Sequence, residues 1–318
     1  MAAHVIPPTT RSLLVLEMAA ELTLRAPARA PVRQATAVVD LGGGHEIALF
    51  GSSTIAGINA VAAREVALAI VNPSATLTLA YRGTGPFEAP LPLRTIAVIP
   101  SRDQYVFAVN PRSGLRTFAD IAAKRPALRI GVRGDRSHSL HFMLDDIMNA
   151  SGFAREDITA WGGEFHYEGV APDPASPKFR AFADGTLDAI FEEGADSWIG
   201  AAIDAGMTIL SLAEPALVEL ERRGYRRAVI PQARYPRLLA DVRTVDFSGW
   251  PLFVHAETPD DDVARICDAL AACAERIPWQ EDGPLSLARM CANAPDAPYD
   301  VPLHPAAERS WRERGVLA

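Results

Sequence analysis

The feature that most constrains the fold is a unit that recurs three times along the chain. Each unit has an apolar strand-like run, a turn rich in Gly, Ser or Asn, and the start of a helix, and the turns centre on Ser52-Ser53, Asn72 to Ser74 and Gly134 to Ser139. Strand-like runs that alternate with helical ones are typical of an α/β protein. In open α/β sheets, ligands bind at the carboxyl ends of strands, where helix N-termini offer unpaired N–H groups. The three turns are therefore candidate anion contacts.

The same alternation predicts elements along the rest of the chain. Its 318 residues are enough for two domains or one large one. Strands are expected over residues 37–39 and 47–50 (around Gly42 to Gly44), 67–71, 95–100, 105–109, 128–132, 187–191, 242–247 and 252–254. Helices are expected over residues 12–24, 54–64, 118–123, 260–276 and 306–314, after Asn72 to Ser74, and from Gly134 to near Gly152.

The charge balance argues against nucleic acid as a partner. Lys and Arg number 31 against 39 Asp and Glu, which leaves a formal net charge of −8. An acidic surface repels phosphate backbones. An anionic ligand is still compatible with the sequence, because the charge of a pocket is set locally.

The sequence predicts a cytoplasmic protein without membrane insertion. Residues 1–10 contain no Lys or Arg and include Pro7-Pro8, and the apolar run that follows is soon interrupted by Glu17 and Glu21, unlike a secretory signal. No run of 18 apolar residues is present. The three cysteines are an odd number, which suggests reduced thiols. A periplasmic location is expected only if a leader has been removed.

Several segments together resemble a known family. They are residues 51–53 and 66–74, Ala80-Tyr81-Arg82-Gly83, Phe87, residues 93–97, Gly114-Leu115, residues 118–121, Ile130-Gly131-Val132, residues 184–189 and residues 303–307. Their order and spacing, over about residues 45–315, are similar to those of the solute-binding subunits of TRAP transporters of the TAXI class. No single motif among them is decisive.

The resemblance implies the fold of type II periplasmic binding proteins, in which two α/β lobes are joined by two crossing strands. A small organic acid would bind in the cleft between them. Lobe one is expected to comprise residues 1–104 and 245–318, and lobe two residues 105–244, with crossings near residues 99–106 and 242–254. The exported signal typical of the family is not visible here. The expected role is therefore a cytosolic sensor or carrier, with a transporter or regulatory protein as a candidate partner.

The candidate ligand-binding residues lie in the expected cleft turns. Ser52, Ser53, Asn72 and Ser74 offer hydroxyl, amide and backbone N–H groups, although Ser and Thr at such positions also serve as plain helix caps. The segment from Arg133 to Ser139 is the richest, since a helix start with a flanking Arg suits bidentate binding of an anion. The remaining candidates are Arg102, Arg136, Ser137, His138, Glu192 and Trp250. Trp161 is a further aromatic, to be weighed against a core role.

An enzyme on the same fold is the alternative. It would be a decarboxylase or hydrolase of an aromatic or dicarboxylic acid, with His138 and Glu192 or Glu193 as acid and base, with or without the assistance of a metal. His138, His141 and Asp145 are spaced to share one helix face, but the spacing matches no established metal motif. We predict no metal and no cofactor, since Gly42 to Gly44 also lacks a nucleotide signature. A module that contacts a regulatory protein is a third, weaker alternative.

Overall fold

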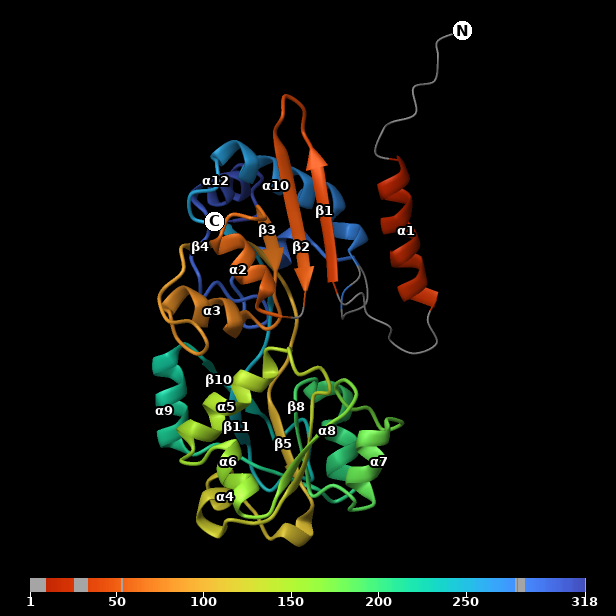
Figure 1. Cartoon of the computed structure of the whole chain (residues 1–318), viewed down its shortest axis with the longest axis vertical. Helices are drawn as coiled ribbons and strands as arrows, with labels where there is room; N and C mark the ends of the chain where they lie inside the picture. The colour runs from red at the N-terminus through yellow and green to blue at the C-terminus, as the bar shows by residue number, and fades with distance from the viewer. Residues whose placement is uncertain (1–9, 26–33, 53, 278, 280–283, 318) are drawn as a thin grey trace.

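The computed structural model describes residues 10–25, 34–52, 54–277, 279 and 284–317. These residues form two five-stranded sheets and a two-stranded ribbon. Figure 1 shows the first sheet and its helices in the upper half of the molecule, and the second sheet, the ribbon and their helices in the lower half. We call these halves the first and second lobes. The expected two-lobed α/β fold is confirmed.

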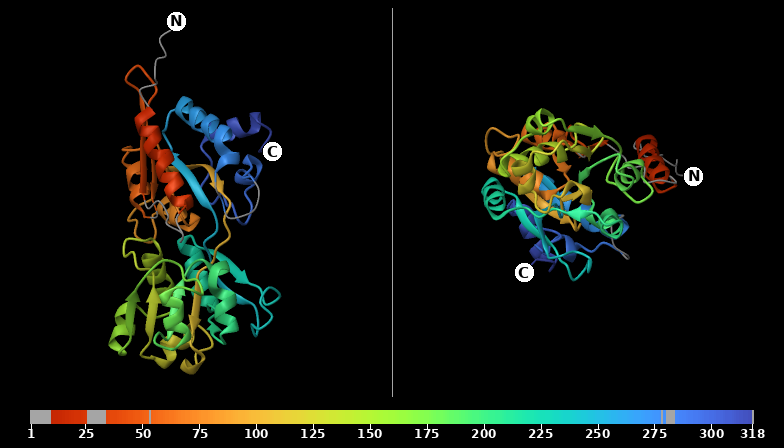
Figure 2. Two further views of the ribbon diagram at one scale, coloured as in Figure 1. Left: turned by 90° about the vertical axis from the view of Figure 1, so that its right-hand side faces the viewer. Right: turned by 90° about the horizontal axis from the view of Figure 1, so that it is seen from below.

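The first lobe is built from both ends of the chain. Its strands, in sheet order, are β1 (Gln34–Asp40), β2 (Glu46–Ser52), β3 (Leu68–Ile70), β12 (Trp250–His255) and β4 (Leu93–Ile99). Its helices are α2 (Ala56–Ala62), α3 (Ser74–Arg82), α10 (Asp260–Cys273), α11 (Leu287–Met290) and α12 (Pro305–Glu313). A preceding helix, α1 (Thr10–Arg25), stands at the side of the molecule in Figure 1 and in the right-hand view of Figure 2.

The second lobe is built from the middle of the chain. Its sheet runs β7 (Glu164–Tyr167), β6 (Arg129–Val132), β8 (Ala189–Glu192), β5 (Val106–Val109) and β9 (Thr208–Ile209), and the ribbon pairs β10 (Arg226–Ile230) with β11 (Val242–Asp246). Its helices are α4 (Ala119–Lys124), α5 (Leu140–Ala150), α6 (Arg155–Ala160), α7 (Pro177–Ala183), α8 (Ala195–Asp204) and α9 (Glu214–Arg223).

Strand direction places the loops that matter for function. In the first sheet β2 and β3 are parallel, and in the second sheet β6 is parallel to both β7 and β8. Neighbouring parallel strands end at the same edge of a sheet. The turns after β2, β3, β6, β7 and β8 are therefore gathered at two edges, one in each lobe. The short strand β3 is apolar, and β6 is apolar after Arg129.

The chain crosses between the lobes twice, and the two crossing segments pair with each other. The first leads from β4 to β5 and the second from β11 to β12. Backbone hydrogen bonds join the Tyr105 amide to the Val245 carbonyl at 3.3 Å, the Phe247 amide to the Asp103 carbonyl at 2.9 Å, and the Gly249 amide to the Ser101 carbonyl at 3.0 Å. The expected pair of crossing strands is thus present as a short antiparallel contact.

Gly249 lies in the second crossing and is expected to be sensitive to substitution. Its φ is +82°, and an added Cβ would lie 2.7 Å from Cδ of Pro298 and 2.9 Å from Cγ1 of Val98. We expect Gly249→Ala to lower the free energy of unfolding by more than the roughly 1–2 kcal/mol that a left-handed backbone alone costs a residue with a Cβ, measured by urea denaturation. Gly152→Ala is the control, because Gly152 has φ +86° with nothing within 4 Å of the added Cβ. Equal losses in both variants would show that the overlap at Gly249 contributes nothing.

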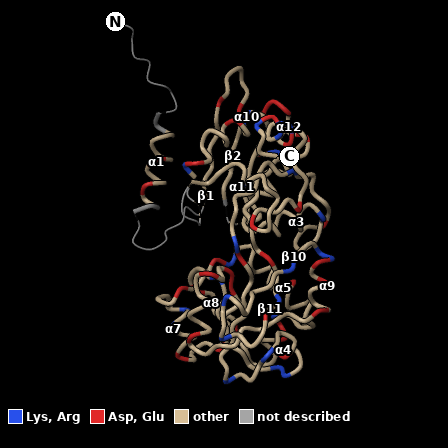
Figure 3. The backbone as a smooth tube through the Cα atoms, turned by 180° about the vertical axis from the view of Figure 1, so that it is seen from behind, with Lys and Arg blue, Asp and Glu red and all other residues tan. Residues whose placement is uncertain are grey.

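Acidic and basic residues are interspersed over both lobes rather than gathered in one region (Figure 3). Many of them are paired, as in the contacts of Arg129 with Asp188 at 2.8 Å and Arg226 with Asp246 at 3.0 Å. The net charge therefore says little about any one pocket, and the charge of a binding site has to be established from its own residues.

Helix α1 exposes most of its large apolar side chains. Leu14, Val15 and Leu22 are 59%, 66% and 69% exposed. The helix predicted over residues 12–24 is confirmed. Among the described residues, no helix has the length and apolar character needed to cross a membrane.

Candidate functional site

A cleft of about 1050 Å³ lies between the two lobes. Its walls are the turns gathered at the two sheet edges, at the carboxyl ends of the parallel strands. We call it the interlobe cleft. The first lobe contributes Ala35, Gly51, Ile70, Val71, Asn72 and Trp250, and the second contributes Arg133, Gly134, Asp135, Arg136, His138, Tyr167, Glu168, Gly169, Val170 and Glu193. This is the edge at which ligands bind in open α/β sheets.

The turn after β6 needs a glycine at its second position. The Gly134 amide donates to the Gly169 carbonyl at 2.9 Å, which joins the turns after β6 and β7. A Cβ on Gly134 would lie 2.8 Å from the Gly169 nitrogen. This close approach of two backbones brings the Arg133 to His138 segment and the Tyr167 to Val170 segment onto one wall of the cleft.

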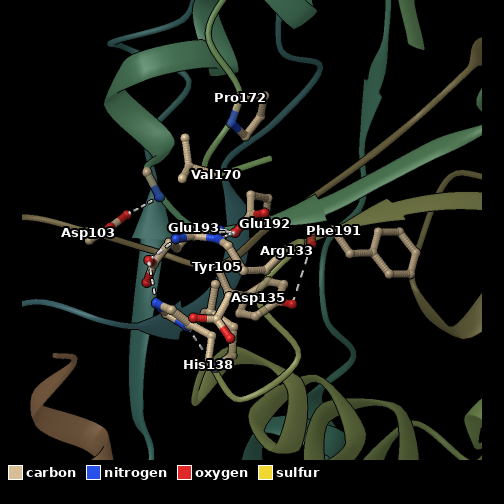
Figure 4. A network of polar contacts seen from close by, with 12 residues as sticks. Asp103, Tyr105, Arg133, Asp135, His138, Val170, Pro172, Phe191, Glu192 and Glu193 are labelled. Carbon is tan, nitrogen blue, oxygen red and sulfur yellow. Dashed lines mark hydrogen bonds and ion pairs between the residues drawn. The ribbon is translucent and has the colours of Figure 1, made fainter. Parts of the chain in front are cut away.

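A buried ion-pair cluster lies beneath this wall (Figure 4). Arg133 donates from Nε and Nη2 to Oε1 of Glu192 at 3.1 and 2.9 Å, and from Nη2 to Oε1 of Glu193 at 2.9 Å. Lys178, in α7, donates from Nζ to Oε2 of Glu192 at 3.0 Å. Glu192 is fully buried, and Lys178 is 2% exposed. Burial raises the pKa of Glu192, but Arg133 and Lys178 outweigh it and hold that pKa below its ordinary value.

Glu193 is the less satisfied carboxyl of the cluster. It is 5% exposed, and its Oε2 atom is buried without a hydrogen-bond partner among the described residues. Burial raises the pKa of Glu193 to about 7, because the attraction of Arg133 only partly offsets desolvation and the charge of Glu192 adds repulsion. Glu193 therefore changes its charge near neutral pH, at the surface of the cleft.

His138 faces Glu193 as a neutral imidazole. Its Nδ1 accepts a hydrogen bond from the Leu140 amide at 3.3 Å, so the ring proton lies on Nε2, which is 3.9 Å from Oε1 of Glu193. Burial and, to a smaller extent, the nearby Arg133 charge lower the pKa of His138 to about 4. The Nε2–H group is thus a donor at the cleft wall that carries no positive charge.

Asp103 connects this cluster to the first crossing segment. Its Oδ1 accepts hydrogen bonds from the amides of Gly194 and Ala195, at the start of α8, at 2.8 and 3.1 Å. Burial raises the pKa of Asp103 well above its ordinary value, and repulsion from Glu193 adds to the shift. The position of Glu193 is therefore tied to the first crossing segment.

Arg136 is the exposed cation of the cleft. Its guanidinium lies over the ring of Tyr167, 3.7 Å from the ring centroid. It makes no ion pair or hydrogen bond with any of the described residues. Stacking on an aromatic ring orients a guanidinium while leaving its N–H groups free. Asp135 and Glu168 are exposed carboxylates in the same lining.

Asn72, on the opposite wall, has a side-chain amide oxygen that is unpaired within the described chain. Its backbone carbonyl accepts from Oγ of Ser139 at 3.2 Å, which links the two lobes, but its side-chain Oδ1 is buried without a partner among the described residues. A buried amide oxygen without a partner is costly unless a ligand or water supplies a donor.

The structure brings five of the predicted site residues together in the cleft lining: Asn72, Arg133, Arg136, His138 and Trp250. Ser53 and the side chain of Ser52 lie outside the described residues. The other four predicted residues are not in the lining: Ser74, Arg102, Ser137 and Glu192. Arg133 also differs from its expected role, because its Nε and Nη2 groups are occupied by glutamates, and only Nη1 makes no hydrogen bond within the described residues.

Of the four residues outside the lining, Glu192 lies in the ion-pair cluster, and the other three have separate contacts or positions. Ser74 is buried and donates from Oγ to the Ser248 carbonyl at 2.6 Å, and Ser137 donates from Oγ to Oδ1 of Asp135 at 2.7 Å. Arg102 is exposed on the first crossing segment. Trp161 packs against Phe153, with ring centroids 6.1 Å apart, and so belongs to the core.

The two histidines and the aspartate considered for a metal have separate partners. One ring nitrogen of His141 lies 2.9 Å from the Asp135 carbonyl oxygen, and Asp145 pairs with Arg155. In the described parts of the chain, no three His, Cys, Asp or Glu side chains are placed to hold a metal ion.

Three contributors to the site were missed in the sequence: Lys178, Asp103 and Tyr167. Lys178 follows the Ser176 cap of α7, so it reads as an ordinary basic residue in a first helical turn. Only its 2% exposure in the folded chain singles it out. Tyr167 ends β7, a strand of four residues that is too short for a clear periodic signal.

Comparison with known proteins gives similar solved structures and one matching family. Among solved structures it is similar to the alkanesulfonate-binding protein SsuA from Xanthomonas axonopodis pv. citri bound to MOPS, at 18% identity and a TM-score of 0.33, over 69% of this chain and 60% of that one. A periplasmic transporter is 16% identical, with a TM-score of 0.36, over 78% and 73% of the two chains. A TctC solute-binding protein from Polaromonas, without ligand, is 17% identical, with a TM-score of 0.33, over 64% and 62%.

The match thus spans less than two thirds of the SsuA and TctC chains. The pattern of the NMT1-like family matches residues 44–315, which include every described residue of the interlobe cleft except Ala35. The chain belongs to the NMT1-like family.

Proposed function

We propose that this protein binds a small organic acid in the interlobe cleft, as a solute-binding protein of the TAXI class. Residues 1–104 and 245–318 would form one rigid lobe and residues 105–244 the other, with closure about the two crossing segments. A transporter or regulatory protein would then recognise the closed form. The class assignment rests on the motif resemblance, and the acid rests on the chemistry of the cleft.

The main support for the proposal is the environment of Arg136. A guanidinium that is oriented by Tyr167 and has no acidic partner in the described chain is suited to hold a carboxylate by two parallel hydrogen bonds. His138 Nε2–H and Arg133 Nη1 add donors on the cleft walls, and the side-chain oxygen of Asn72 can accept from a donor on the ligand. Trp250 offers an apolar surface for the rest of the ligand.

Matched acids and amides test this proposal. Benzoate and butanoate would be compared with benzamide and butanamide, which have similar shapes but no charge. We expect the acids to raise the melting temperature, since ligands that bind only the native state stabilise it, and the amides to have little effect. Titration calorimetry would supply the dissociation constants. Equal effects of acid and amide, or no effect of any acid, would contradict the proposal.

The affinity for an acid is expected to depend on pH through Glu193. Its pKa of about 7 means that Glu193 is mostly protonated at pH 6 and mostly charged at pH 8. A ligand carboxylate is repelled by the charged form, so binding favours the protonated one. Affinity should be nearly constant below pH 6 and fall by up to about tenfold per pH unit above pH 7. Calorimetry with benzoate between pH 5.5 and 8.5 would measure this.

Glu193→Gln is the matched control for the pH dependence. Glutamine keeps the size and the oxygen that accepts from Arg133, but it cannot ionise. The variant should bind benzoate at pH 8 as tightly as the wild type does at pH 6. His138, with a pKa of about 4, stays neutral throughout this range and cannot produce the effect. A variant that keeps the wild-type pH slope would assign the titration to another group.

An enzyme is the second candidate, and one observation favours it. A carboxyl with a pKa of about 7 stands beside a neutral imidazole in the same cleft, an arrangement suited to general acid–base catalysis. Mass spectrometry of each stabilising acid after incubation would decide between the two functions. Recovery of the acid unchanged supports binding alone, whereas a product that disappears in Glu193→Gln would establish catalysis.

A further inference from the structure

We propose that the bound acid carries an apolar tail, which lies in a second hollow that continues the interlobe cleft along the first sheet. This inference rests on the proposed function, because the tail needs a head group held in the cleft. It adds the chemical class of the ligand: an acid with an aliphatic or similarly slender apolar chain.

The hollow is open, apolar and joined to the cleft. It has a volume of about 230 Å³ and is lined by Ala35, Ala37, Leu49, Phe50, Gly51, Leu68, Ala69, Ile70 and Leu252. Three of these residues, Ala35, Gly51 and Ile70, also line the interlobe cleft. A ligand can therefore pass from one to the other without leaving the protein surface. We call this region the side hollow.

Strand register explains its shape. Across β1, β2 and β3, one row pairs Ala35 with Gly51 and Gly51 with Ile70, and the next row pairs Ala37 with Leu49 and Leu49 with Leu68. Alternate residues of a strand point to the same face, so both rows lie on one face of the sheet. Small residues on β1 and β2 form the depression. The first row adjoins the cleft, and the second lies about 7 Å farther along the strands.

This part of the sheet face is left open by the helices. The core on that face forms where α10, α11 and α12 pack over β4 and β12, and it includes Ile96, Val254 and Val263. Leu68, Ile70 and Leu252 are only partly buried against it. Helix α2 packs on the opposite face, where Ile58 and Ala69 are buried. An exposed apolar surface that continues a binding cleft is characteristic of a ligand groove.

The size of the side hollow sets the expected length of the tail. With a volume of about 230 Å³, the side hollow has room for several methylene groups. Arg136, which would hold the carboxylate, lies on the second-lobe wall of the cleft. The first methylenes of the tail would cross the cleft, and the later ones would lie over Gly51 and then Ala37.

A homologous series of straight-chain acids tests this inference. We would titrate the full chain with butanoate, hexanoate, octanoate and decanoate. Affinity should rise by about fourfold per methylene, the fold-change that corresponds to about 0.8 kcal/mol, until the side hollow is filled. Matched alkyl amides would show whether the carboxylate is still required.

Two variants locate the tail. Gly51→Val blocks the junction, and it should fold, because a Cβ at Gly51 meets only Cγ2 of Ile70 at 3.7 Å. Because Gly51 also lines the interlobe cleft, the readout for this variant is the ratio of octanoate to butanoate affinity, and we expect that ratio to fall toward one. Ala37→Leu fills the row of Ala37, Leu49 and Leu68. In this variant the affinity should still rise from butanoate to hexanoate, but it should not rise further with octanoate. Val38→Leu is the control, since Val38 is 60% exposed on the opposite face of β1.

The outcomes separate the two proposals. If short acids bind but affinity does not rise with chain length, the tail inference fails and the proposed function stands. If affinity rises with length but neither Gly51→Val nor Ala37→Leu reduces the gain, the tail lies elsewhere and the inference also fails. If no acid of any length binds, the proposed function fails, and the tail inference fails with it.

Discussion

Replacing Arg133 with methionine is expected to lower the free energy of unfolding by about 3–5 kcal/mol. Arg133 is the shared partner of Glu192 and Glu193, and its side chain is 10% exposed. Its removal leaves Glu192 paired with Lys178 and breaks the ion pair between Arg133 and Glu193. A buried charge that loses its partner costs far more than the pair contributed, because it cannot return to water.

Urea denaturation followed by circular dichroism would measure this loss. The control replaces Arg133, Glu192 and Lys178 by methionine and Glu193 by glutamine, which removes the buried charges of the cluster together. That variant should recover most of the stability, since apolar residues of similar volume often substitute for a buried ion pair at little cost. A single Arg133→Met loss below about 1 kcal/mol would mean that the cluster is solvated rather than buried.

Arg136→Gln is expected to weaken acid binding by about 1.5–3 kcal/mol, or roughly 10- to 150-fold, without a comparable loss of stability. The Arg136 guanidinium is exposed and contacts Tyr167 by stacking, so the fold does not depend on it. A ligand carboxylate would lose its charged hydrogen bonds. Calorimetry with benzoate at pH 6 would give the ratio of dissociation constants.

Arg102→Gln is the matched comparison. Arg102 is also an exposed arginine, but it lies on the first crossing segment and outside the cleft lining. We expect its affinity for benzoate to remain within twofold of the wild type. If Arg102→Gln weakened binding as much as Arg136→Gln, the acid would bind nearer the crossing segments, and the placement of the head group at Arg136 would be wrong.

Local pattern in the sequence was sufficient to predict the frame of the site. The turns at Asn72 and at Gly134 to His138 were predicted from an apolar run followed by Gly, Ser or Asn, and both line the cleft. The prediction succeeds because each strand and the turn that follows it form a local sequence pattern, and the ends of parallel strands meet at one edge of the sheet. Between residues 155 and 230 only β8 was predicted, over residues 187–191. Several of the strands missed there have only two to five residues.

Charge pairing could not be predicted in the same way. Arg133 reads as an anion-binding residue from its neighbours, but Glu192 and Glu193 lie 59 and 60 positions away along the chain and occupy two of its nitrogens. Trp161 and Trp250 likewise follow similar local patterns, yet one packs in the core and the other faces the cleft. Such differences arise from tertiary contacts that no local window contains.

The position of β12 in the first sheet has a consequence for biosynthesis. β12 (Trp250–His255) lies between β3 and β4, which precede it by more than 150 positions and make no strand pairing with each other. On the ribosome, all strands of the second sheet emerge before β12 does. The second lobe can therefore fold first. Until β12 is synthesised, the edges of β3 and β4 that pair with it remain unpaired. Nascent chains stalled after β11 would carry a protease-resistant second lobe joined to a protease-sensitive N-terminal part.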